Sequence, residues 1–431
     1  MSLFEQQDEL ARESNKFWMN TSYFPESAII FRDQIYEKPK NKEKKLIEAI
    51  LTKDSIVKIS KNCVFKMASI HWKLVTPFIE EQNGETFYGF TLGHENCNRD
   101  FYVNNENSLN DWINHLQQFC IMTDFDNDFV IIKELGEGSF SKVYLAANCL
   151  TKTIYAVKAI SKETLFENSV NFVNQINEIA LLRKVNHPNI IKLHMVYENE
   201  DYIYLVLDYA EGGDLYQRML KKNTLSEAEA SIIGVKMLDI LEYLESMHIV
   251  HRDIKLENIL LTSKDRIDNF ILADFGLAEE LKEESTKKCG SPGYVAPEIL
   301  RNHSYSCKVD LYSTGIVLYI LISGKMPFSG RNAKETLIKN KEGVISFHNQ
   351  IWKNKSKNAI DAVIKLTEKE PEFRPSPREA FALPFFNSGA INSTSLLKLD
   401  SLKKNLDTSR AKNEPFELLL RNGQKSKCND K

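Results

Sequence analysis

The sequence predicts a multidomain α+β protein with a β-rich unit near the N-terminus and a longer mixed unit behind it. The chain has 431 residues, which allows about three domains at roughly 150 residues each. Runs of β-branched and aromatic residues crowd the first 104 residues, and a helical pattern follows them. The composition also changes near residues 124 and 387, so we expect domain boundaries there.

The composition is that of a folded protein and excludes several classes. Apolar residues make up 42% and charged residues 27%, which excludes a disordered chain, a collagen and a coiled-coil rod. The net charge of −3 provides no overall basic field, so we expect no nucleic-acid partner. Seven scattered Cys residues without a C-x-x-C pair argue against a zinc ribbon or a disulfide framework. Without an apolar signal core or a bilayer-spanning stretch, we expect a cytoplasmic protein. We also expect it to be a monomer.

Five short runs predict the strands of the β-rich unit: residues 28–31, 45–51, 55–59, 87–92 and 100–103. Asn, Gly and Lys-Asp turns separate them, and antiparallel strands of this length can close into a small sandwich or barrel. The next segment, NSLNDWINHLQQF, predicts a helix that Ser108 caps. Its apolar residues recur at helical spacing: Leu109, Trp112, Ile113 and Leu116.

A β-rich unit that ends in one helix with an apolar-face Trp resembles a pleckstrin-homology (PH) domain over residues 25–122. Lipid-binding members of that family place cations on the first strand and loop. The cations in that region here are Arg32, Lys38, Lys40, Lys42, Lys44 and Lys45. The resemblance therefore implies either binding of phosphoinositide headgroups, with peripheral membrane attachment, or docking to a protein. Both alternatives stay open, as does a loop that is simply solvated.

We divide the chain into an N-terminal extension, the PH-like unit, a polar linker, a second folded unit and a tail: residues 1–24, 25–122, 123–128, 129–386 and 387–431. The linker, TDFDND, looks like the start of a calcium loop. However, Phe129 and Leu135 occupy the positions that need a Gly and a Glu, so we expect no calcium site there.

The second unit opens with a strand, a glycine-containing turn and another strand. The residues concerned are Leu135, Gly136, Glu137, Gly138, Ser139, Phe140, Ser141, Lys142 and Val143. Glycines let such a hairpin close over phosphates with its backbone N–H groups pointing inward. A Rossmann turn would lead into a helix and a Walker loop would need Gly-Lys-Ser/Thr, so the pattern fits neither.

Further motifs follow this hairpin in a fixed order. Lys158 lies on a predicted strand, and Glu178 lies twenty residues later in a helical stretch, so an ion pair between them would fix the ammonium for phosphates. A long helix with a capping box then leads to the sequence HRDIKLEN, residues 251–258. Asp274-Phe-Gly and Ala-Pro-Glu298 come next. Together these motifs form the protein-kinase signature.

Residues 129–386 therefore resemble a Ser/Thr protein kinase of the calmodulin-dependent group, and the resemblance implies a bilobal fold with a β-rich N-lobe and a mostly helical C-lobe. It assigns catalysis to Asp253, Lys158, Lys255, Asn258 and Asp274. Asn258 and Asp274 would hold Mg²⁺. Besides the hairpin, the ATP site would comprise Ala156, Lys158, Glu178, Leu207, Asp208, Ala210, Asp214 and Leu260.

The implied reaction is transfer of the γ-phosphate of Mg-ATP to Ser or Thr hydroxyls of proteins. Glu257 occupies a position that family members use to prefer Arg upstream of the target residue. The alternative is a pseudokinase scaffold that acts through its PH-like unit. Two structural contacts are also implied: an ion pair between Glu298 and Arg374, and Asp310 bracing the catalytic-loop backbone.

The activation segment departs from the family pattern. Lys287 stands where a phosphorylated Thr is usual. We favour Thr286 as the substitute phosphosite, where a phosphate would pair with Arg252. The alternative is an enzyme that does not need this switch. In the tail, residues 395–412 have no Trp anchor and acidic residues interrupt their basic face, which favours a disordered or back-packing tail over a calmodulin target.

Overall fold

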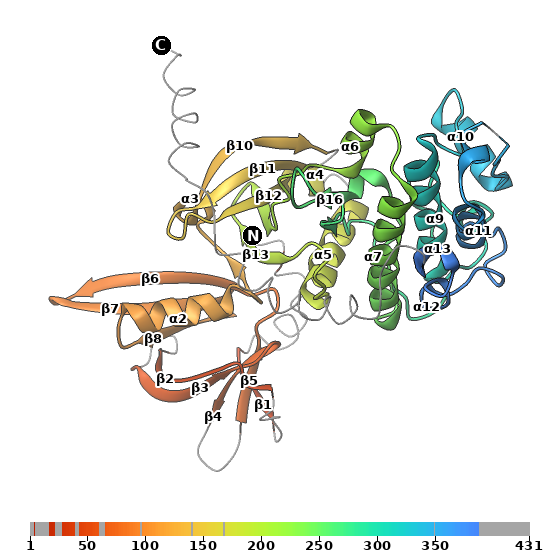
Figure 1. The fold of residues 1–431 in the computed structure, drawn as a ribbon. Helices are drawn as coiled ribbons and strands as arrows, with labels where there is room; N and C mark the ends of the chain where they lie inside the picture. Colours follow the sequence, from red (N-terminus) through yellow and green to blue (C-terminus); the bar gives the residue numbers. More distant parts are fainter. Residues whose placement is uncertain are drawn as a thin grey trace. The chain divides into compact units, whose positions relative to one another are not determined.

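The computed structural model describes residues 4, 17–21, 28–38, 43–59, 65–94, 97–138, 141–166, 169–348 and 350–387. Most of the predicted N-terminal extension, Lys40, Lys42, Ser139, Phe140 and the predicted tail beyond Asn387 lie outside these described residues. The described residues form two compact units (Figure 1). The β unit contains residues up to 166 together with 193–208, and the helical unit contains residues 169–192 and those from 209 onward.

The β unit contains one sheet of 14 strands in the described part of the chain, in the order β1-β5-β4-β3-β2-β8-β7-β6-β9-β13-β14-β12-β11-β10. Its first strands are β1 (Met19–Thr21), β2 (Phe31–Lys38), β3 (Lys45–Leu51), β4 (Ser55–Ile59), β5 (Phe65–Ser69), β6 (Leu74–Gln82), β7 (Glu85–His94) and β8 (Cys97–Val103). The others are β9 (Ile121–Met122), β10 (Phe129–Glu137), β11 (Ser141–Asn148), β12 (Ile154–Ser161), β13 (Leu193–Glu198) and β14 (Tyr202–Leu207).

The N-terminal module, which we define as β1–β8 with helix α2 (Glu106–Leu116), is built from antiparallel neighbours. The helix contacts β6, β7 and β8 (Figure 1). Trp112 is fully buried and donates a hydrogen bond from Nε1 to Asp33 at 3.1 Å. Asn105, and not Ser108 as predicted, caps the helix by accepting from the Ser108 N–H at 2.9 Å.

The predicted strands of this module agree with the structure in part. The predictions at 45–51 and 55–59 are confirmed by β3 and β4, and those at 87–92 and 100–103 lie inside β7 and β8. The prediction at 28–31 is wrong, because β2 begins only at Phe31. Strands β1, β5 and β6 were not predicted. In β6, Pro77 and the exposed polar residues at its end obscure the strand pattern.

The segment that we predicted to be a polar linker packs into the β unit. It includes a short helix, α3 (Phe125–Asp128), whose Phe125 is buried and stacks on Tyr204 with ring centroids 4.1 Å apart. Asp128 accepts a hydrogen bond from the Tyr197 hydroxyl at 2.7 Å. Just before it, β9 pairs in parallel with both β6 and β13. The N-terminal module and strands β10–β14 consequently share one apolar core.

The helical unit contains the helices α5 (Ser169–Lys184), α6 (Leu215–Lys222), α7 (Glu227–Ser246), α8 (Pro297–Leu300), α9 (Lys308–Ser323), α10 (Ala333–Glu342), α11 (Lys357–Leu366), α12 (Pro377–Ala380) and α13 (Pro384–Asn387). Its centre is α9, which is apolar around most of its surface and packs on α7 and α11 (Figure 1). The predicted capping box at the start of α7 is confirmed, with Ser226 and Glu229 bonded reciprocally.

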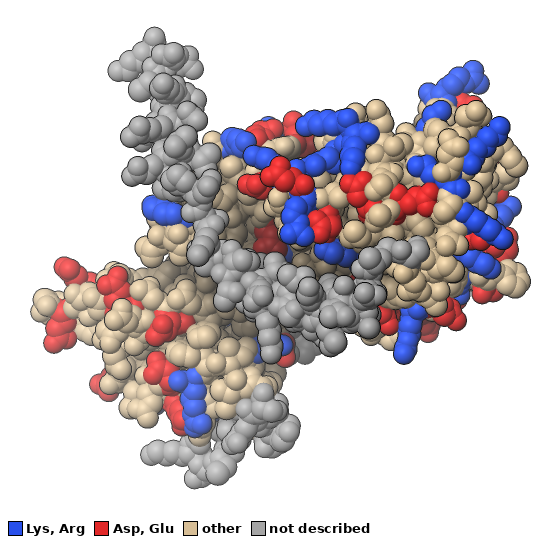
Figure 2. Space-filling model, in the orientation of Figure 1, with Lys and Arg blue, Asp and Glu red and all other residues tan. Residues whose placement is uncertain are grey.

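Two short antiparallel pairs complete the helical unit and frame the candidate site. Strand β15 (Ile249–Val250) pairs with β18 (Glu279–Glu280), and β16 (Ile259–Leu261) pairs with β17 (Phe270–Leu272). None of the described helices is both long and apolar enough to cross a membrane. On the face drawn in Figure 2, basic and acidic side chains are interspersed over the described surface.

Candidate active site

The backbone of the catalytic loop, residues 251–258, is fixed by the helix beneath it. The loop runs from the end of β15 to the start of β16. Asp310, in the first turn of the buried helix α9, accepts hydrogen bonds from the His251 N–H at 2.6 Å and the Arg252 N–H at 2.8 Å. This confirms the predicted role of Asp310 in bracing the loop.

Asp253 is held as a carboxylate by two donors. Lys255 donates from Nζ to Oδ2 at 2.6 Å, and the Ser291 hydroxyl donates to Oδ1 at 2.6 Å. Lys255 also lies 3.0 Å from the Ser291 hydroxyl oxygen. Burial alone would raise the pKa of Asp253, but the bonds from Lys255 and Ser291 outweigh it and lower that pKa. The contact of Ser291 with Asp253 was not predicted from the sequence.

Asn258 lies against the same carboxylate. Its Nδ2 donates to the Asp253 carbonyl at 2.8 Å and to the Asp253 carboxylate at 3.1 Å, which leaves the amide Oδ1 to face a cation. Asp274 follows β17 in a left-handed conformation with φ 65°. An amide oxygen and a carboxylate are hard donors of the kind that Mg²⁺ prefers, with phosphate and water oxygens as the remaining ligands. The donor chemistry of Asn258 and Asp274 therefore fits the predicted Mg²⁺ site.

Helix α5 brings Glu178 to the segment that starts at Asp274. Gln175 donates to the Glu178 carboxylate at 3.0 Å, and Asn177 donates to the Ala278 carbonyl at 2.7 Å. A Cβ placed on Gly276 would lie 3.7 Å from the Glu178 carboxylate and 3.2 Å from that of Asp274. Glycine thus lets the carboxylates of Glu178 and Asp274 both lie close to this backbone position. Lys158 belongs to the other unit, so its predicted ion pair with Glu178 stays a prediction.

In the β unit, four predicted nucleotide contacts share one face of the sheet. Val143 on β11 lies opposite Lys158 on β12, and Ala156 on β12 lies opposite Leu207 on β14. Because Ala156 and Lys158 are two residues apart, all four side chains project to the same side. An apolar surface with one cation at its end is what an adenine ring and its phosphates require.

The remaining predicted residues are divided between the units. Leu135, Gly136 and Glu137 end strand β10, and Gly138 donates from its N–H to the Ser141 carbonyl at 2.7 Å. Lys142 lies 3.6 Å from the carboxylates of both Glu134 and Glu137.

Two of the predicted ATP-site residues between 208 and 214 already form hydrogen bonds within the protein. Asp208 accepts from His194 at 2.8 Å. In the helical unit, beyond Ala210, Asp214 caps α6 by accepting from the Gln217 N–H at 2.7 Å and forms a backbone bridge with Leu260. Its carboxylate therefore has a structural role, whatever else it contacts.

A buried ion pair joins Glu298, which follows the activation segment, to Arg374. Arg374 donates from Nη1 to Glu298 at 2.8 Å, and both side chains are almost fully buried. Two backbone carbonyls, of Glu368 and Lys308, accept the other guanidinium hydrogens at 2.7–3.1 Å. The predicted pair of Glu298 with Arg374 is confirmed.

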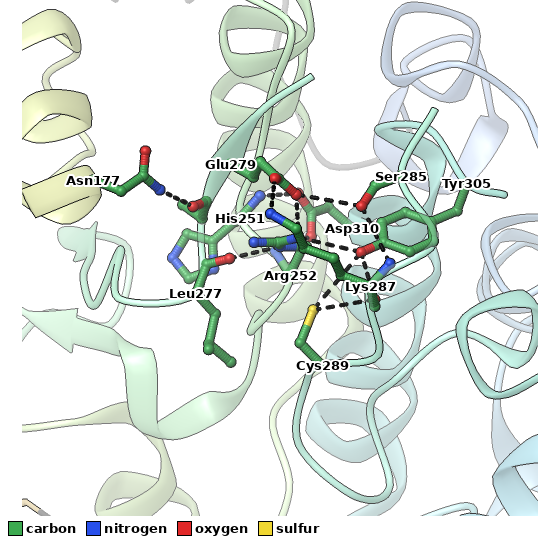
Figure 3. Close-up of polar contacts among 11 residues, drawn as sticks. Asn177, His251, Arg252, Leu277, Glu279, Ser285, Lys287, Cys289, Tyr305 and Asp310 are labelled. Carbon is green, nitrogen blue, oxygen red and sulfur yellow. Dashed lines mark hydrogen bonds and ion pairs between the residues drawn. The ribbon is translucent and has the colours of Figure 1, made fainter. Parts of the chain in front are cut away.

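Arg252 has an anion partner that the sequence did not reveal. Its guanidinium donates to the Leu277 carbonyl at 2.6 Å, pairs with Glu279 and lies 3.3 Å from the Tyr305 hydroxyl (Figure 3). We predicted a phosphate on Thr286 for this position. A carboxylate three residues after Gly276 was visible in the sequence, but its approach to Arg252 depends on the pairing of β15 with β18.

Comparison with known proteins agrees with this geometry. The family description "Protein kinase domain" matches residues 129–386. The chain belongs to the protein kinase family. A kinase domain has two lobes, as the resemblance implied.

Two relatives extend the comparison. The chain is 37% identical over 282 residues to the "Probable serine/threonine-protein kinase 2" of Plasmodium falciparum, a match that covers 65% of this chain and 54% of that protein. It is 36% identical over 275 residues to "Myosin light chain kinase A" of Dictyostelium discoideum, covering 63% of this chain and 92% of that protein. The chain thus spans about half the length of the first relative and most of the second.

Proposed function

We propose that the protein is a Ser/Thr protein kinase that transfers the γ-phosphate of Mg-ATP to hydroxyls of protein substrates. The observation that carries this proposal is the hydrogen-bonded group around Asp253, in which Lys255, Ser291 and Asn258 all contact one carboxylate. Such a group orients a hydroxyl and neutralises charge on a transferred phosphate, which is most of what phosphoryl transfer needs.

Each residue of the group has a distinct part in the reaction. Asp253 stays ionised at neutral pH because its pKa is lowered, so it accepts the hydrogen bond of a substrate hydroxyl. Lys255 lies 2.6 Å from that carboxylate and provides a cation beside the transferred phosphoryl group. Bound Mg²⁺ would neutralise the phosphate charge, and Asn258 and Asp274 would hold it. Lys255, two residues after Asp253, supports Ser/Thr over Tyr specificity.

The decisive assay is incorporation of ³²P from [γ-³²P]ATP into a basic Ser/Thr peptide library, followed by phosphoamino-acid analysis. Asp274→Ala should abolish incorporation, because it removes the proposed metal ligand. The matched control is Asp265→Ala, which removes an exposed carboxylate from the same unit and should leave incorporation intact. Labelling of Tyr alone would contradict the proposed specificity.

The pseudokinase alternative predicts a different result from the same assay. A scaffold would incorporate no ³²P into the peptides, either as wild type or as Asp274→Ala, whether or not it binds ATP. The upstream preference is tested in the library as well. Glu257 is exposed at the edge of the catalytic loop, so Glu257→Gln should weaken selection of upstream Arg while leaving kcat on a neutral peptide within about twofold.

For the N-terminal module, the contacts support intramolecular docking over membrane binding. Two of the cations near the first strands already have partners: Arg32 pairs with Glu48, and Lys44 lies 3.7 Å from the ring centroids of both Phe87 and Tyr102. Strand β9 also joins the module to β13, because it pairs with β6 on one side and with β13 on the other. Red side chains gather at the tip of the β6–β7 hairpin in Figure 2, and that acidic tip would repel anionic lipid.

Vesicle co-sedimentation with and without phosphoinositides separates the two roles. Docking within the chain predicts no lipid-dependent pelleting at physiological salt. A lipid site predicts pelleting that is lost when Lys42, Lys44 and Lys45 are all changed to Glu. Addition of calcium–calmodulin to the kinase assay tests the tail in parallel, and we expect no stimulation.

A further inference from the structure

The activation segment begins beside the catalytic loop. Strand β18 pairs antiparallel with β15, and in this register Glu279 lies opposite Val250. Two residues after Val250 comes Arg252, whose side chain is only 8% exposed. The backbone thus brings a carboxylate of the activation segment to a nearly buried cation that stands directly before the catalytic Asp253.

Glu279 contacts three groups from two chain segments (Figure 3). Its carboxylate pairs with Arg252 and with Lys287, and the Ser285 hydroxyl donates to it at 3.3 Å. The Lys287 side chain is 70% exposed and that of Glu279 is 22% exposed, so the carboxylate lies between an inner and an outer cation. We call these residues, Arg252, Glu279, Ser285 and Lys287, the Glu279 cluster.

Tyr305 holds the same segment from the other side. It forms a backbone bridge with Ser285, with N···O distances of 3.1 and 2.9 Å. Its hydroxyl donates to the Lys287 carbonyl at 2.8 Å and lies 3.8 Å from the Cys289 thiol. Contacts from Glu279 and Tyr305 therefore hold residues 285–289 from two sides.

We infer that Glu279 is a positioning residue that does the work of an activation-segment phosphate. An added phosphate orders such a segment by pairing with arginine. Here the carboxylate of Glu279 already pairs with Arg252, and the usual phosphosite is a cation, Lys287, that faces the same carboxylate. The inference rests on the proposed kinase activity, and it replaces Thr286 phosphorylation as the source of order.

The charge of Glu279 is suited to this role at any pH near neutrality. Burial acts to raise its pKa, but Lys287, Arg252 and Ser285 outweigh burial and lower it below the ordinary value. A phosphate has a second pKa of about 6 and changes charge in the physiological range, whereas this carboxylate does not.

The first experiment measures kcat for the full chain made with a co-expressed protein phosphatase, with peptide mass mapping to verify that residues 279–289 carry no phosphate. We expect kcat within about twofold of the untreated protein, and the same for Thr286→Ala. A fall of tenfold or more on dephosphorylation, reproduced by Thr286→Ala, would overturn the inference.

The second experiment reverses the charges. Glu279→Lys places three cations together and should lower kcat by about a hundredfold, with KM for ATP within about twofold. Adding Lys287→Glu to that variant returns an anion beside Arg252 and should recover at least tenfold, which a merely structural loss would not do. Glu279→Asp should be milder. The matched control is Glu283→Lys, the same change at an exposed position of the same segment. Absence of rescue would contradict the inference.

A third readout does not need activity. Trypsin cleavage after Lys288 reports order in the segment, and Glu279→Gln should accelerate it by about tenfold relative to wild type. Wild type that incorporates no phosphate in any arm would refute the proposed function, while the cleavage rates would still decide the inference. Equal cleavage rates in wild type and Glu279→Gln would overturn it.

Discussion

At each of two places in the molecule, a single carboxylate pairs with two cations. In the N-terminal module, Glu37 lies 2.5 Å from Lys58 and 3.5 Å from Arg99. In the helical unit, Glu279 pairs with Arg252 and Lys287. The Glu37 side chain is 4% exposed and that of Glu279 is 22% exposed, and the outer partner of Glu279, Lys287, is 70% exposed.

The difference in burial separates a structural group from an adjustable one. Glu37 also accepts from the Trp18 indole at 2.7 Å, and burial lowers the pKa of Lys58 despite that carboxylate. Removing one partner of a buried pair leaves an uncompensated charge, which costs far more than losing an exposed pair. The Glu279 cluster instead includes an exposed cation, Lys287, so its contribution should appear in activity more than in stability.

The largest expected effect on stability is at the buried group. Glu37→Gln leaves Lys58 and Arg99 without their anionic partner, and it should lower the free energy of unfolding by about 3–5 kcal/mol. Urea unfolding followed by fluorescence measures this. The control is Glu48→Gln, whose pair with Arg32 is exposed and should contribute less than about 1 kcal/mol. Equal costs for the two variants would remove the distinction.

A smaller effect should follow from Trp18→Phe. The change keeps an aromatic ring but removes the hydrogen bond to Glu37 and weakens the contact of Lys58, whose Nζ lies 4.3 Å from the Trp18 ring centroid. A hydrogen bond to a charged group contributes about 1.5–3 kcal/mol. The loss should be smaller when Trp18→Phe is made in the Glu37→Gln background, where the indole can bond only to a neutral amide oxygen, so a double-mutant cycle checks the coupling.

At the other group, Glu279→Gln should lower the free energy of unfolding by about 1 kcal/mol, less than Glu37→Gln, because the nearly buried Arg252 keeps its bond to the Leu277 carbonyl and Lys287 is exposed. Its pH dependence has a definite sign. Because the folded pKa of Glu279 is lowered, the contribution is present above the ordinary value near 4.5 and is lost as the pH falls through the folded pKa. Unfolding of wild type and variant from pH 8 down to about pH 2 should show curves that converge at the acidic end. A gap that widens toward acid would contradict the assignment.

The smallest effect should come from Lys287→Gln. The Lys287 side chain is 70% exposed, so its pair with Glu279 should contribute only about 0.2–0.5 kcal/mol and should weaken with added salt. The unfolding midpoint at low and high ionic strength measures this. A cost that matches Glu37→Gln would place Lys287 in the same structural class as Lys58.

The catalytic residues could be predicted because each lies in a short motif of fixed spacing. Asp253, Asn258 and Lys255 are within six residues of one another, and local backbone geometry alone brings them together. The partner of Arg252 could not be predicted in this way. Glu279 and Glu280 are adjacent, and only the register of β18 against β15 decides which one faces the arginine.

The N-terminal module shows a similar limit at the level of strands. The compact apolar runs of β3 and β4 mark their boundaries directly. Strand β6 breaks its pattern with Pro77 and an acidic end, and it is stabilised by pairing with β7 along its length. Asn105 and Ser108 are both good caps, so the choice between them depends on where the backbone leaves β8. Propensity identifies such candidates, and tertiary packing selects among them.

The brief strand β9 has a practical consequence for dissecting the protein. It is flanked by β6 and β13 and uses hydrogen-bonding groups of both. A fragment that starts at residue 129, where the family match begins, would lack β9 and leave β13 with an open edge. Bare edges invite strand addition from other molecules. Isolated catalytic fragments should therefore self-associate unless they retain Ile121 and Met122, which form the strand that pairs with this edge.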